Sequence, residues 1–330
     1  MKSVLFNILG SKKNGTGHIY RALSLAKEIN LNYKIIFITN RTQKLAIQNL
    51  KKTNYVFFAY PEKKIFKQIK KHSPDIVIND VLSTNKNNIK FLKRNSIKVI
   101  NFEDLGNGNL SADLTINEIY QKPKKNTKKI LWGEKYFFLR DEFVKQNKNK
   151  FKKIKNILLF FGGSDPNNLT LKTLKSIYFS AEKFNIKILI ITGIGYKNIS
   201  NLKKFIKNKK NIILINNTKK ISHYMQKVQI AFTSNGRTTY ELAHMNIPSI
   251  VISHNKRESQ HKFASIKNGF INLGKFNKKK FLFNNLNLQF VNLIKNTNEY
   301  KKLYNSMLKI NFSLGRQRVK NAINKIEKLF

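Results

Sequence analysis

The chain has 330 residues, 41% of them hydrophobic, which is enough for two domains of about 100–200 residues, each with its own core. It has no cysteine, which excludes disulfides, thiolate zinc sites and cysteine nucleophiles. Lysine and arginine number 64 against 17 acidic residues, a formal net charge of +47. Because the lysines are spread along the whole chain and no nucleic-acid module accompanies them, we expect a compositional habit and no specific nucleic-acid partner.

The first residues, 1–10, have the pattern of a buried strand, since no small-residue cleavage site of a signal peptide follows them. No apolar stretch approaches the ~20 residues of a membrane helix. We therefore expect a cytoplasmic protein, most simply a monomer, that associates at most weakly with an anionic membrane surface.

Strand-like and helix-like segments alternate through the first half of the chain. The expected strands are 4–9, 34–38, 55–58, 76–78 and 99–102. The expected helices between them are 19–29, 43–52, 62–72 and 86–95. This alternation is typical of α/β domains with a doubly wound parallel sheet.

The polar run 145–150 is interpreted as a linker, because the alternation starts again after it. The expected strands of the second half are 157–161, 186–191, 212–215, 230–233 and 249–252, and the last forty residues have helical periodicity. The pattern predicts two Rossmann-like domains, 1–147 and 148–330, with the helical tail in the second.

A glycine turn, Gly15-Thr16-Gly17-His18, follows the first strand. Thr16 stands where a Walker loop requires lysine, and Tyr20 replaces the third glycine of the dinucleotide fingerprint. What remains is a loop in which Gly15 and Gly17 favour an anion at a helix start. The helix dipole there favours the neutral imidazole that a general base requires, although His18 could equally cap or pack the helix.

Acidic residues follow several strands, where the carboxyl ends of a parallel sheet border its ligand site. Asp80, Glu103, Asp104 and Asp165 are such residues. They are candidates to orient sugar hydroxyls or to assist His18. The alternative is helix capping, which we favour for Asp165 and leave open for Asp80.

Two turns in the second half predict a phosphate site. The run Gly162-Gly163-Ser164-Asp165 allows close approach of backbone to a ligand, and Ser234-Asn235-Gly236-Arg237-Thr238 opens a helix after a strand. Glu241, further along that helix, could accept hydrogen bonds from ribose hydroxyls or could compensate the helix dipole.

The segment 254–261, which includes Gln260, follows a strand and could reach into a ligand cleft beside these turns. Its two histidines, His254 and His261, are seven residues apart with no third ligand nearby. We therefore expect no metal site here.

These motifs resemble those of the UDP-sugar hydrolases of pseudaminic acid synthesis and of the related spore coat polysaccharide biosynthesis proteins. The resemblance lies in Gly-x-Gly-His at 15–18, Phe-Leu-Arg-Asp-Glu-Phe at 138–143, Gly-Gly-Ser-Asp-Pro-Asn-Asn-Leu-Thr at 162–170 and Ser-Asn-Gly-Arg-Thr-Thr-Tyr-Glu-Leu-Ala at 234–243. It covers nearly the whole chain, with the motifs in the expected order. It implies a GT-B fold, in which two Rossmann-like domains face each other across a cleft.

The resemblance also implies a reaction and roles for individual residues. His18 would be the base that activates a water to attack the anomeric carbon with inversion, Asp80 is the second candidate catalytic residue, and no cofactor or metal is required. The remaining candidates, expected to contact the UDP-sugar, are Gly15, Gly17, Arg21, Gly163, Ser164, Asn235, Gly236, Arg237, Thr238, Glu241 and Gln260.

Residues 81 and 82 depart from the family pattern. Val81-Leu82 follows Asp80, where the hydrolases have a tyrosine shortly after the matching aspartate. The sugar is thus not fixed by the motifs, and a GT-B glycosyltransferase that passes the sugar to an acceptor is the alternative. A nucleic-acid-binding protein would explain the charge but not the two glycine turns.

Overall fold

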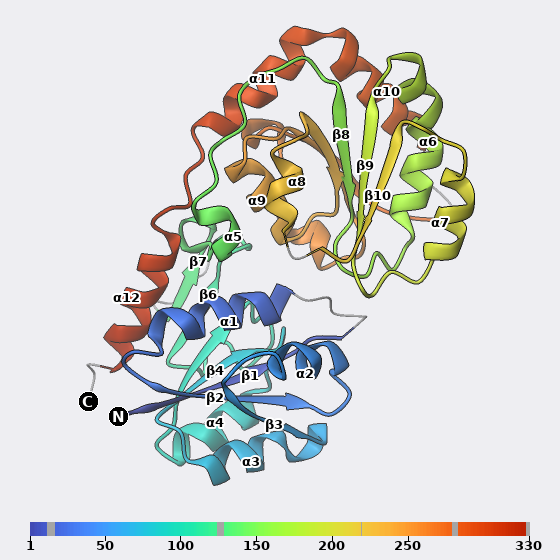
Figure 1. Ribbon diagram of the computed structural model, residues 1–330. Helices are drawn as coiled ribbons and strands as arrows, with labels where there is room; N and C mark the ends of the chain where they lie inside the picture. Colours follow the sequence, from blue (N-terminus) through green and yellow to red (C-terminus); the bar gives the residue numbers. More distant parts are fainter. Residues whose placement is uncertain (12–16, 124–128, 219, 279–282, 328–330) are drawn as a thin grey trace. The chain divides into compact units, whose positions relative to one another are not determined.

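A computed structural model describes the chain except residues 12–16, 124–128, 219, 279–282 and 328–330. The chain divides into two compact units (Figure 1). Unit 1 combines Met1–Arg140 with Phe312–Phe330, and unit 2 is Asp141–Asn311. Each unit is a parallel β-sheet with helices packed on it.

The sheet of unit 1 has seven strands in the order β3-β2-β1-β4-β5-β6-β7, and all neighbours are parallel. The strands are β1 (Ser3–Ile8), β2 (Lys34–Asn40), β3 (Val56–Tyr60), β4 (Ile76–Asp80), β5 (Lys98–Phe102), β6 (Leu114–Asn117) and β7 (Ile130–Trp132). The central strands are almost continuously apolar because both of their faces are covered. The sequence patterns predicted β1 to β5 but not β6 and β7.

Helices cover both faces of this sheet. They are α1 (Gly17–Ile29), α2 (Lys44–Leu50), α3 (Ile65–His72), α4 (Lys86–Arg94) and α12 (Gly315–Glu327), with 3₁₀ turns η1 (Glu62–Lys64) and η2 (Glu134–Tyr136). Because neighbouring strand residues point to opposite faces, Phe6 packs in one core with α1, α2 and α12, whereas Leu5 packs in the other with α3 and α4.

Helix α12 belongs to unit 1, although the sequence pattern suggested a tail on the second domain. Val319 and Ile323 are fully buried in the core beneath α1. Arg316 donates from Nε to the Leu139 carbonyl at 2.6 Å and pairs through Nη1 with Glu28 at 2.9 Å. The chain therefore leaves unit 1 after residue 140, not 147, and returns to it at residue 312.

Unit 2 has a six-stranded parallel sheet in the order β10-β9-β8-β11-β12-β13. The strands are β8 (Asn156–Phe160), β9 (Lys187–Thr192), β10 (Ile212–Asn216), β11 (Ile230–Thr233), β12 (Ser249–Ser253) and β13 (Phe270–Lys275). The helices and 3₁₀ turns are α5 (Asp141–Val144), α6 (Leu169–Lys183), α7 (Ile199–Ile206), α8 (Ile221–Met225), α9 (Arg237–His244), η3 (Glu258–Gln260), η4 (Ile266–Asn268), α10 (Phe283–Lys295) and α11 (Thr297–Leu308). The prediction of two Rossmann-like domains with C-terminal helices is confirmed.

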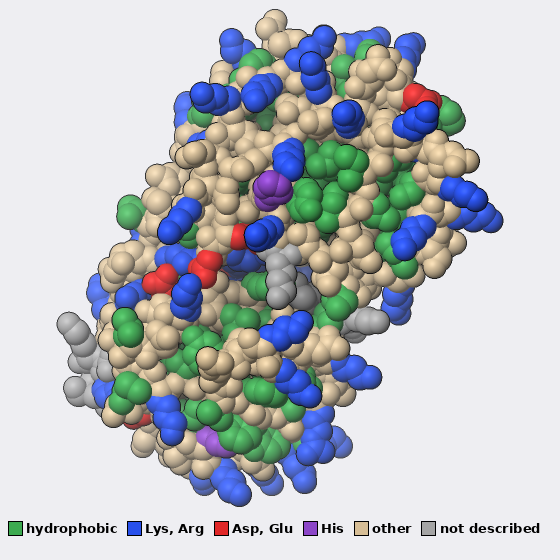
Figure 2. Space-filling model, viewed as in Figure 1, with side chains coloured by type: hydrophobic (Ala, Val, Ile, Leu, Met, Phe, Trp, Pro, Cys, Tyr) green, Lys and Arg blue, Asp and Glu red, His purple; other side chains and the backbone are tan. Residues whose placement is uncertain are grey.

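The basic side chains of one face of the molecule are visible in Figure 2. On the face drawn in Figure 2, Lys and Arg side chains are scattered over both units, and acidic side chains are few. None of the helices in the described residues combines the length and apolar character needed to cross a bilayer.

Candidate functional site

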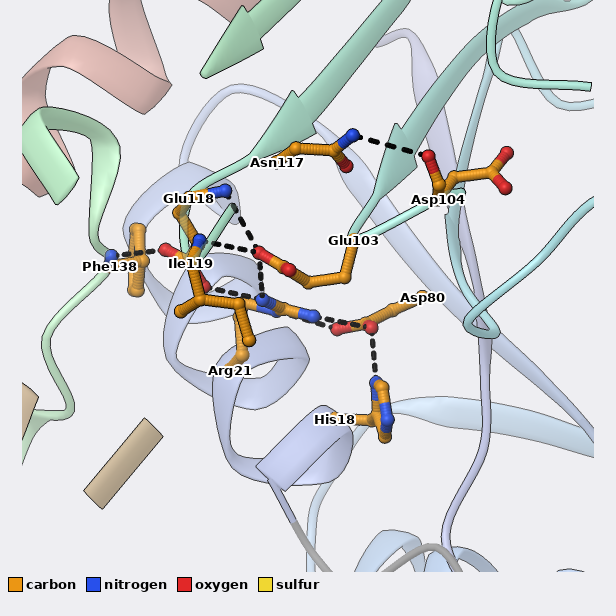
Figure 3. A network of polar contacts seen from close by, with 9 residues as sticks. All are labelled: His18, Arg21, Asp80, Glu103, Asp104, Asn117, Glu118, Ile119 and Phe138. Atoms are coloured by element: carbon orange, nitrogen blue, oxygen red, sulfur yellow. Dashed lines mark hydrogen bonds and ion pairs between the residues drawn. The ribbon is translucent and has the colours of Figure 1, made fainter. Parts of the chain in front are cut away.

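The start of α1 brings His18 to the carboxyl end of β4. Gly17 is the first residue of the helix and His18 the second, while Ile19 and Ala22 pack into the core beneath. Arg21 lies three residues after His18, so both side chains project from the same side of the helix. That side meets the last residue of β4, Asp80 (Figure 3).

Asp80 connects His18 to Arg21. One of its oxygens, Oδ1, contacts His18 Nδ1, and its two oxygens accept from Arg21 Nε at 2.8 Å and Nη2 at 2.6 Å. Asp80 is 1% exposed. Burial by itself raises the pKa of this carboxyl, but the Arg21 guanidinium and His18 outweigh it and hold the pKa well below its usual range.

The charge of Asp80 determines which nitrogen of His18 carries the hydrogen. An ionised carboxylate only accepts hydrogen bonds, so Nδ1 of a neutral His18 is the donor and Nε2 has the free lone pair. The His18 side chain is 12% exposed, whereas that of Asp80 is 2% exposed. The arrangement is thus an imidazole held from behind by a buried carboxylate.

The other end of the Arg21 guanidinium meets two more carboxylates. Nη1 donates to Glu118 and, at 3.5 Å, to Glu103 (Figure 3). The Phe102 ring centroid lies 5.0 Å from Arg21 Cζ. Arg21 is 1% exposed, and its neighbouring carboxylates outweigh the effect of burial and raise its pKa.

This burial changes the role expected for two sequence candidates in unit 1. Arg21 was expected to contact the substrate, but its guanidinium is enclosed by carboxylates, so we assign it to holding Asp80. The capping alternative for Asp80 is wrong, because α4 is capped by Asn85, whose side chain accepts from Asn87 N at 2.8 Å. Gly15 lies outside the described residues.

Asp104 has a separate structural task. It is 1% exposed and accepts from Thr84 N at 3.0 Å, Thr84 Oγ1 at 2.5 Å, Asn101 Nδ2 at 2.7 Å and Gly106 N at 2.7 Å. Burial raises the pKa of Asp104, against the effect of these hydrogen bonds. It therefore braces the loops after β4 and β5 and does not contact His18.

In unit 2, the turn after β8 contains Gly162 and Gly163. A second pair of glycines, Gly193 and Gly195, packs against this turn. Gly162 has a φ of +83°, which favours glycine, and the Gly163 carbonyl accepts from Gly195 N at 3.0 Å. A Cβ on Gly193 would lie 2.4 Å from the same carbonyl oxygen. Gly193 and Gly195 were not among the predicted site residues, although their spacing directly after a predicted strand was an available signal.

Asp165 caps α6, as favoured from the sequence. It is 3% exposed and accepts from Leu169 N at 2.7 Å and Thr170 N at 2.8 Å. Ser164, just before it, is partly exposed. Asp165 therefore fixes the start of α6. The turn 162–164 just before it can approach a ligand with its backbone.

The turn after β11 ends in Gly236, the N-cap of α9. Gly236 has no side chain that could accept hydrogen bonds from the first N–H groups of α9. The next two residues, Arg237 and Thr238, are half-buried. Asn235, by contrast, is 1% exposed and donates from Nδ2 to the carbonyls of Glu258 and His261, each at 3.0 Å. Its amide therefore braces the loop after β12.

That loop contains two buried histidines. His254 donates from Nε2 to the Phe161 carbonyl at 3.1 Å, and its backbone N–H donates to Glu258 at 2.7 Å. His261 donates from Nδ1 to the Asn235 carbonyl at 2.5 Å. These bonds join the loops after β8, β11 and β12 into one polar cluster.

Glu241 and Gln260 differ in exposure. Glu241 is 3% exposed on α9, whereas Gln260, at the end of η3, lies at the surface. No group of three or more histidine or acidic side chains in the described residues has the arrangement of a metal site.

Comparison with solved structures identifies the class of fold. The chain matches the crystal structure of MurG from Acinetobacter baumannii with a TM-score of 0.68 at 14% identity, over 98% of this chain and 100% of that one. It matches a structure of MnaA from Staphylococcus aureus with UDP with a TM-score of 0.62 at 13% identity, over 100% and 98%. The two parallel-sheet units thus form a glycosyltransferase-like GT-B fold.

Curated sequences give two relatives. An uncharacterised protein of Methanocaldococcus jannaschii is 33% identical over an alignment of 271 residues; the match covers 76% of this chain and 55% of that protein, so the chain spans about half its length. The spore coat polysaccharide biosynthesis protein SpsG of Bacillus subtilis is 23% identical over 271 residues, 78% of each. No family model matches the chain.

Proposed function

We propose that this protein hydrolyses a UDP-linked amino or deoxy sugar to UDP and free sugar, for nonulosonic acid or surface polysaccharide synthesis. The observation that carries the proposal is the contact between His18, at the start of α1, and the buried, ionised Asp80 at the end of β4. The similarity to SpsG, a spore coat polysaccharide biosynthesis protein, supports the pathway class.

In the proposed reaction, His18 Nε2 takes a proton from water as the water oxygen attacks the anomeric carbon. The bond between that carbon and the β-phosphate oxygen breaks, UDP leaves with the electron pair, and the configuration inverts. The resulting imidazolium faces the Asp80 carboxylate, which stabilises it and keeps Nδ1 as the donor. The proton then passes to solvent, which the 12% exposure of the His18 side chain permits.

Unit 2 is the proposed nucleotide-binding unit. The backbone of Gly163 and Ser164 and the first N–H groups of α9, at Gly236 to Thr238, suit a diphosphate, because N–H groups and a helix dipole favour negative charge. We propose Glu241 for the ribose hydroxyls. The S. aureus MnaA structure supports this choice of ligand, because it has the same fold and contains UDP.

A GT-B glycosyltransferase remains the second candidate, and the likeness to the crystal structure of a glycosyltransferase from Rickettsia africae, with a TM-score of 0.61 at 15% identity, favours it. His18 would then take its proton from an acceptor hydroxyl instead of water. The donor site would be unchanged, so UDP binding does not separate the two reactions.

A panel of UDP-sugars incubated with the purified protein separates them. We expect stoichiometric UDP and free sugar without an acceptor, with the inverted anomer seen first by ¹H NMR. His18→Gln should lower kcat by about 10²–10⁴-fold, the usual contribution of a general base, and leave UDP affinity intact. The control is His223→Gln, at an exposed histidine of α8.

Two results would contradict the proposal. UDP release that requires an added acceptor alcohol would establish transfer in place of hydrolysis. Turnover by His18→Gln at a rate near that of the unmodified protein would remove the assigned base.

A further inference from the structure

Glu118 is the far end of the polar network that begins at His18. It directly follows β6 and is 0% exposed. One oxygen accepts from Arg21 Nη1, and the other accepts from Phe138 N at 2.5 Å (Figure 3). Sequence patterns gave no reason to select it, because β6 was not predicted.

Glu103 fixes the backbone around Glu118. Its Oε1 accepts from Glu118 N at 2.9 Å and Ile119 N at 3.3 Å, and also from Arg21 Nη1 at 3.5 Å. Glu103 itself has a left-handed backbone with a φ of +52°, which is unfavourable for a residue with a side chain. Such strained residues concentrate at functional sites.

The charge balance of the network is unusual for this chain. Three of its 17 acidic side chains, Asp80, Glu103 and Glu118, are buried around one guanidinium. Burying carboxylates is costly unless each is paired, and apolar residues of the same size would often be as stable. Arg21 meets Asp80 through Nε and Nη2 and Glu118 through Nη1, so both ends of its planar group are fixed.

We propose that Glu118 is a positioning residue for the reaction of His18 and acts through Arg21 and Asp80. This inference rests on the proposed function of His18 as the base. Glu118 neutralises the far end of the guanidinium, which leaves the Asp80 carboxylate enough negative charge to orient Nδ1 and to stabilise the imidazolium. Without Glu118, Arg21 would keep Asp80 and the longer contact to Glu103, at 3.5 Å, as its carboxylate partners, and would draw more strongly on Asp80.

The variant Glu118→Gln tests this, because it removes the charge and keeps the shape. We expect kcat to fall by roughly 10–100-fold, as for other residues behind a functional group, with KM changed by less than about 3-fold. Loss of a negative charge disfavours protonated His18, so the acid limb of the kcat/KM profile should move to lower pH. In an Arg21→Gln background, Glu118→Gln should add less than about 2-fold, because the path through Arg21 is already broken.

The matched control is Asp113→Asn, another carboxylate-to-amide change in unit 1. Asp113 accepts from Val99 N at 2.9 Å and pairs with Lys93 at 2.8 Å, without contact to the network. We expect a lower Tm with the original kcat and pH profile. If Glu118→Gln behaves in the same way, Glu118 is only structural and the proposal is overturned.

Two further measurements cover other outcomes. If Glu118→Gln does not fold, Glu118→Asp keeps the charge but shortens its reach, and we expect a lower kcat with the original acid limb. An unchanged kcat would overturn the proposal.

Ring ¹⁵N NMR of histidine-labelled protein, with His18→Gln for assignment, needs no substrate. We expect the Nδ1–H form of His18 in both chains, because Asp80 stays ionised, and an Nδ1–H proton resonance that moves upfield in Glu118→Gln as the hydrogen bond to Asp80 weakens. An unchanged resonance would refute positioning even if no UDP-sugar is hydrolysed, whereas a shifted resonance with no hydrolysis would refute only the reaction.

Discussion

Mild acid should destabilise unit 2 through His261. Its side chain is 5% exposed, with Nδ1 bonded to the Asn235 carbonyl. Burial lowers its pKa from 6.5 to about 4; the bond to Asn235 opposes this, and the nearby Arg257 contributes to it. The same loop also contains His254, Lys256, Glu258 and Lys262, and burial raises the pKa of Glu258.

The sign follows from proton binding. Between pH 6.5 and about 4 the unfolded chain has a protonated His261, whereas the folded protein has a neutral one, so stability falls as the pH falls. At pH 4.5 the loss relative to pH 7 is about 2.5 kcal/mol, at ~1.36 kcal/mol per pKa unit. For a domain of this size, that lowers Tm by roughly 5–10 °C.

The assay must follow unit 2 separately. The single tryptophan, Trp132, lies in β7 of unit 1, so its fluorescence reports the other unit. Hydrogen exchange of peptides from β11 and β12, at pH 7 and 4.5 with correction for the intrinsic rate, gives the stability around His261. His261→Gln should remove about 2.5 kcal/mol of the pH dependence, and His223→Gln should retain it. Equal pH dependence in His261→Gln and the unmodified chain would refute the reasoning.

Two substitutions test the turns of unit 2. Gly193→Ala places a Cβ 2.4 Å from the carbonyl oxygen of Gly163 and 2.5 Å from the Cα of Gly163. Because the backbone cannot move away at low cost, we expect the free energy of unfolding in urea to fall by about 1–3 kcal/mol. We also expect weaker UDP binding by calorimetry. An unchanged UDP affinity would show that the 162–164 turn does not contact the nucleotide. Asp165→Ala removes the acceptor for two N–H groups of α6 and should cost about 1–2 kcal/mol in the same assay, while unchanged stability would argue against the cap.

Segments whose own pattern is strong were predictable from the sequence. The runs that became β1, β8 and β12 are apolar on both faces and are bounded by turn residues, so periodicity alone identifies them. β7 has only three residues, and β13 contains Gly274 with a φ of +81°. Such short or interrupted strands form because a neighbouring strand pairs with them, which a single sequence does not disclose.

The residues of the candidate site divide in the same way. His18 could be predicted because a glycine turn after a strand places it at a helix start. The role of Arg21 could not, because the three carboxylates that enclose it come from β4 and from the ends of β5 and β6, 59 to 97 residues away in the chain. The place of α12 depends likewise on packing, since an amphipathic helix shows which of its faces is buried but not which sheet it covers.

Asp80 and Asp165 show why one aspartate after a strand positions a histidine while another caps a helix. Asp80 is the last residue of β4, so the strand fixes its direction and turns it toward α1 on one face of the sheet. Asp165 lies beyond the end of β8, in a turn where its φ of +38° lets the side chain reach forward to α6, four residues later. Of these two aspartates, the one at the last strand residue thus faces the helix packed on that face, and the one in the following turn faces the next helix. The place of each relative to the strand end, not the residue type, decides which contacts it makes.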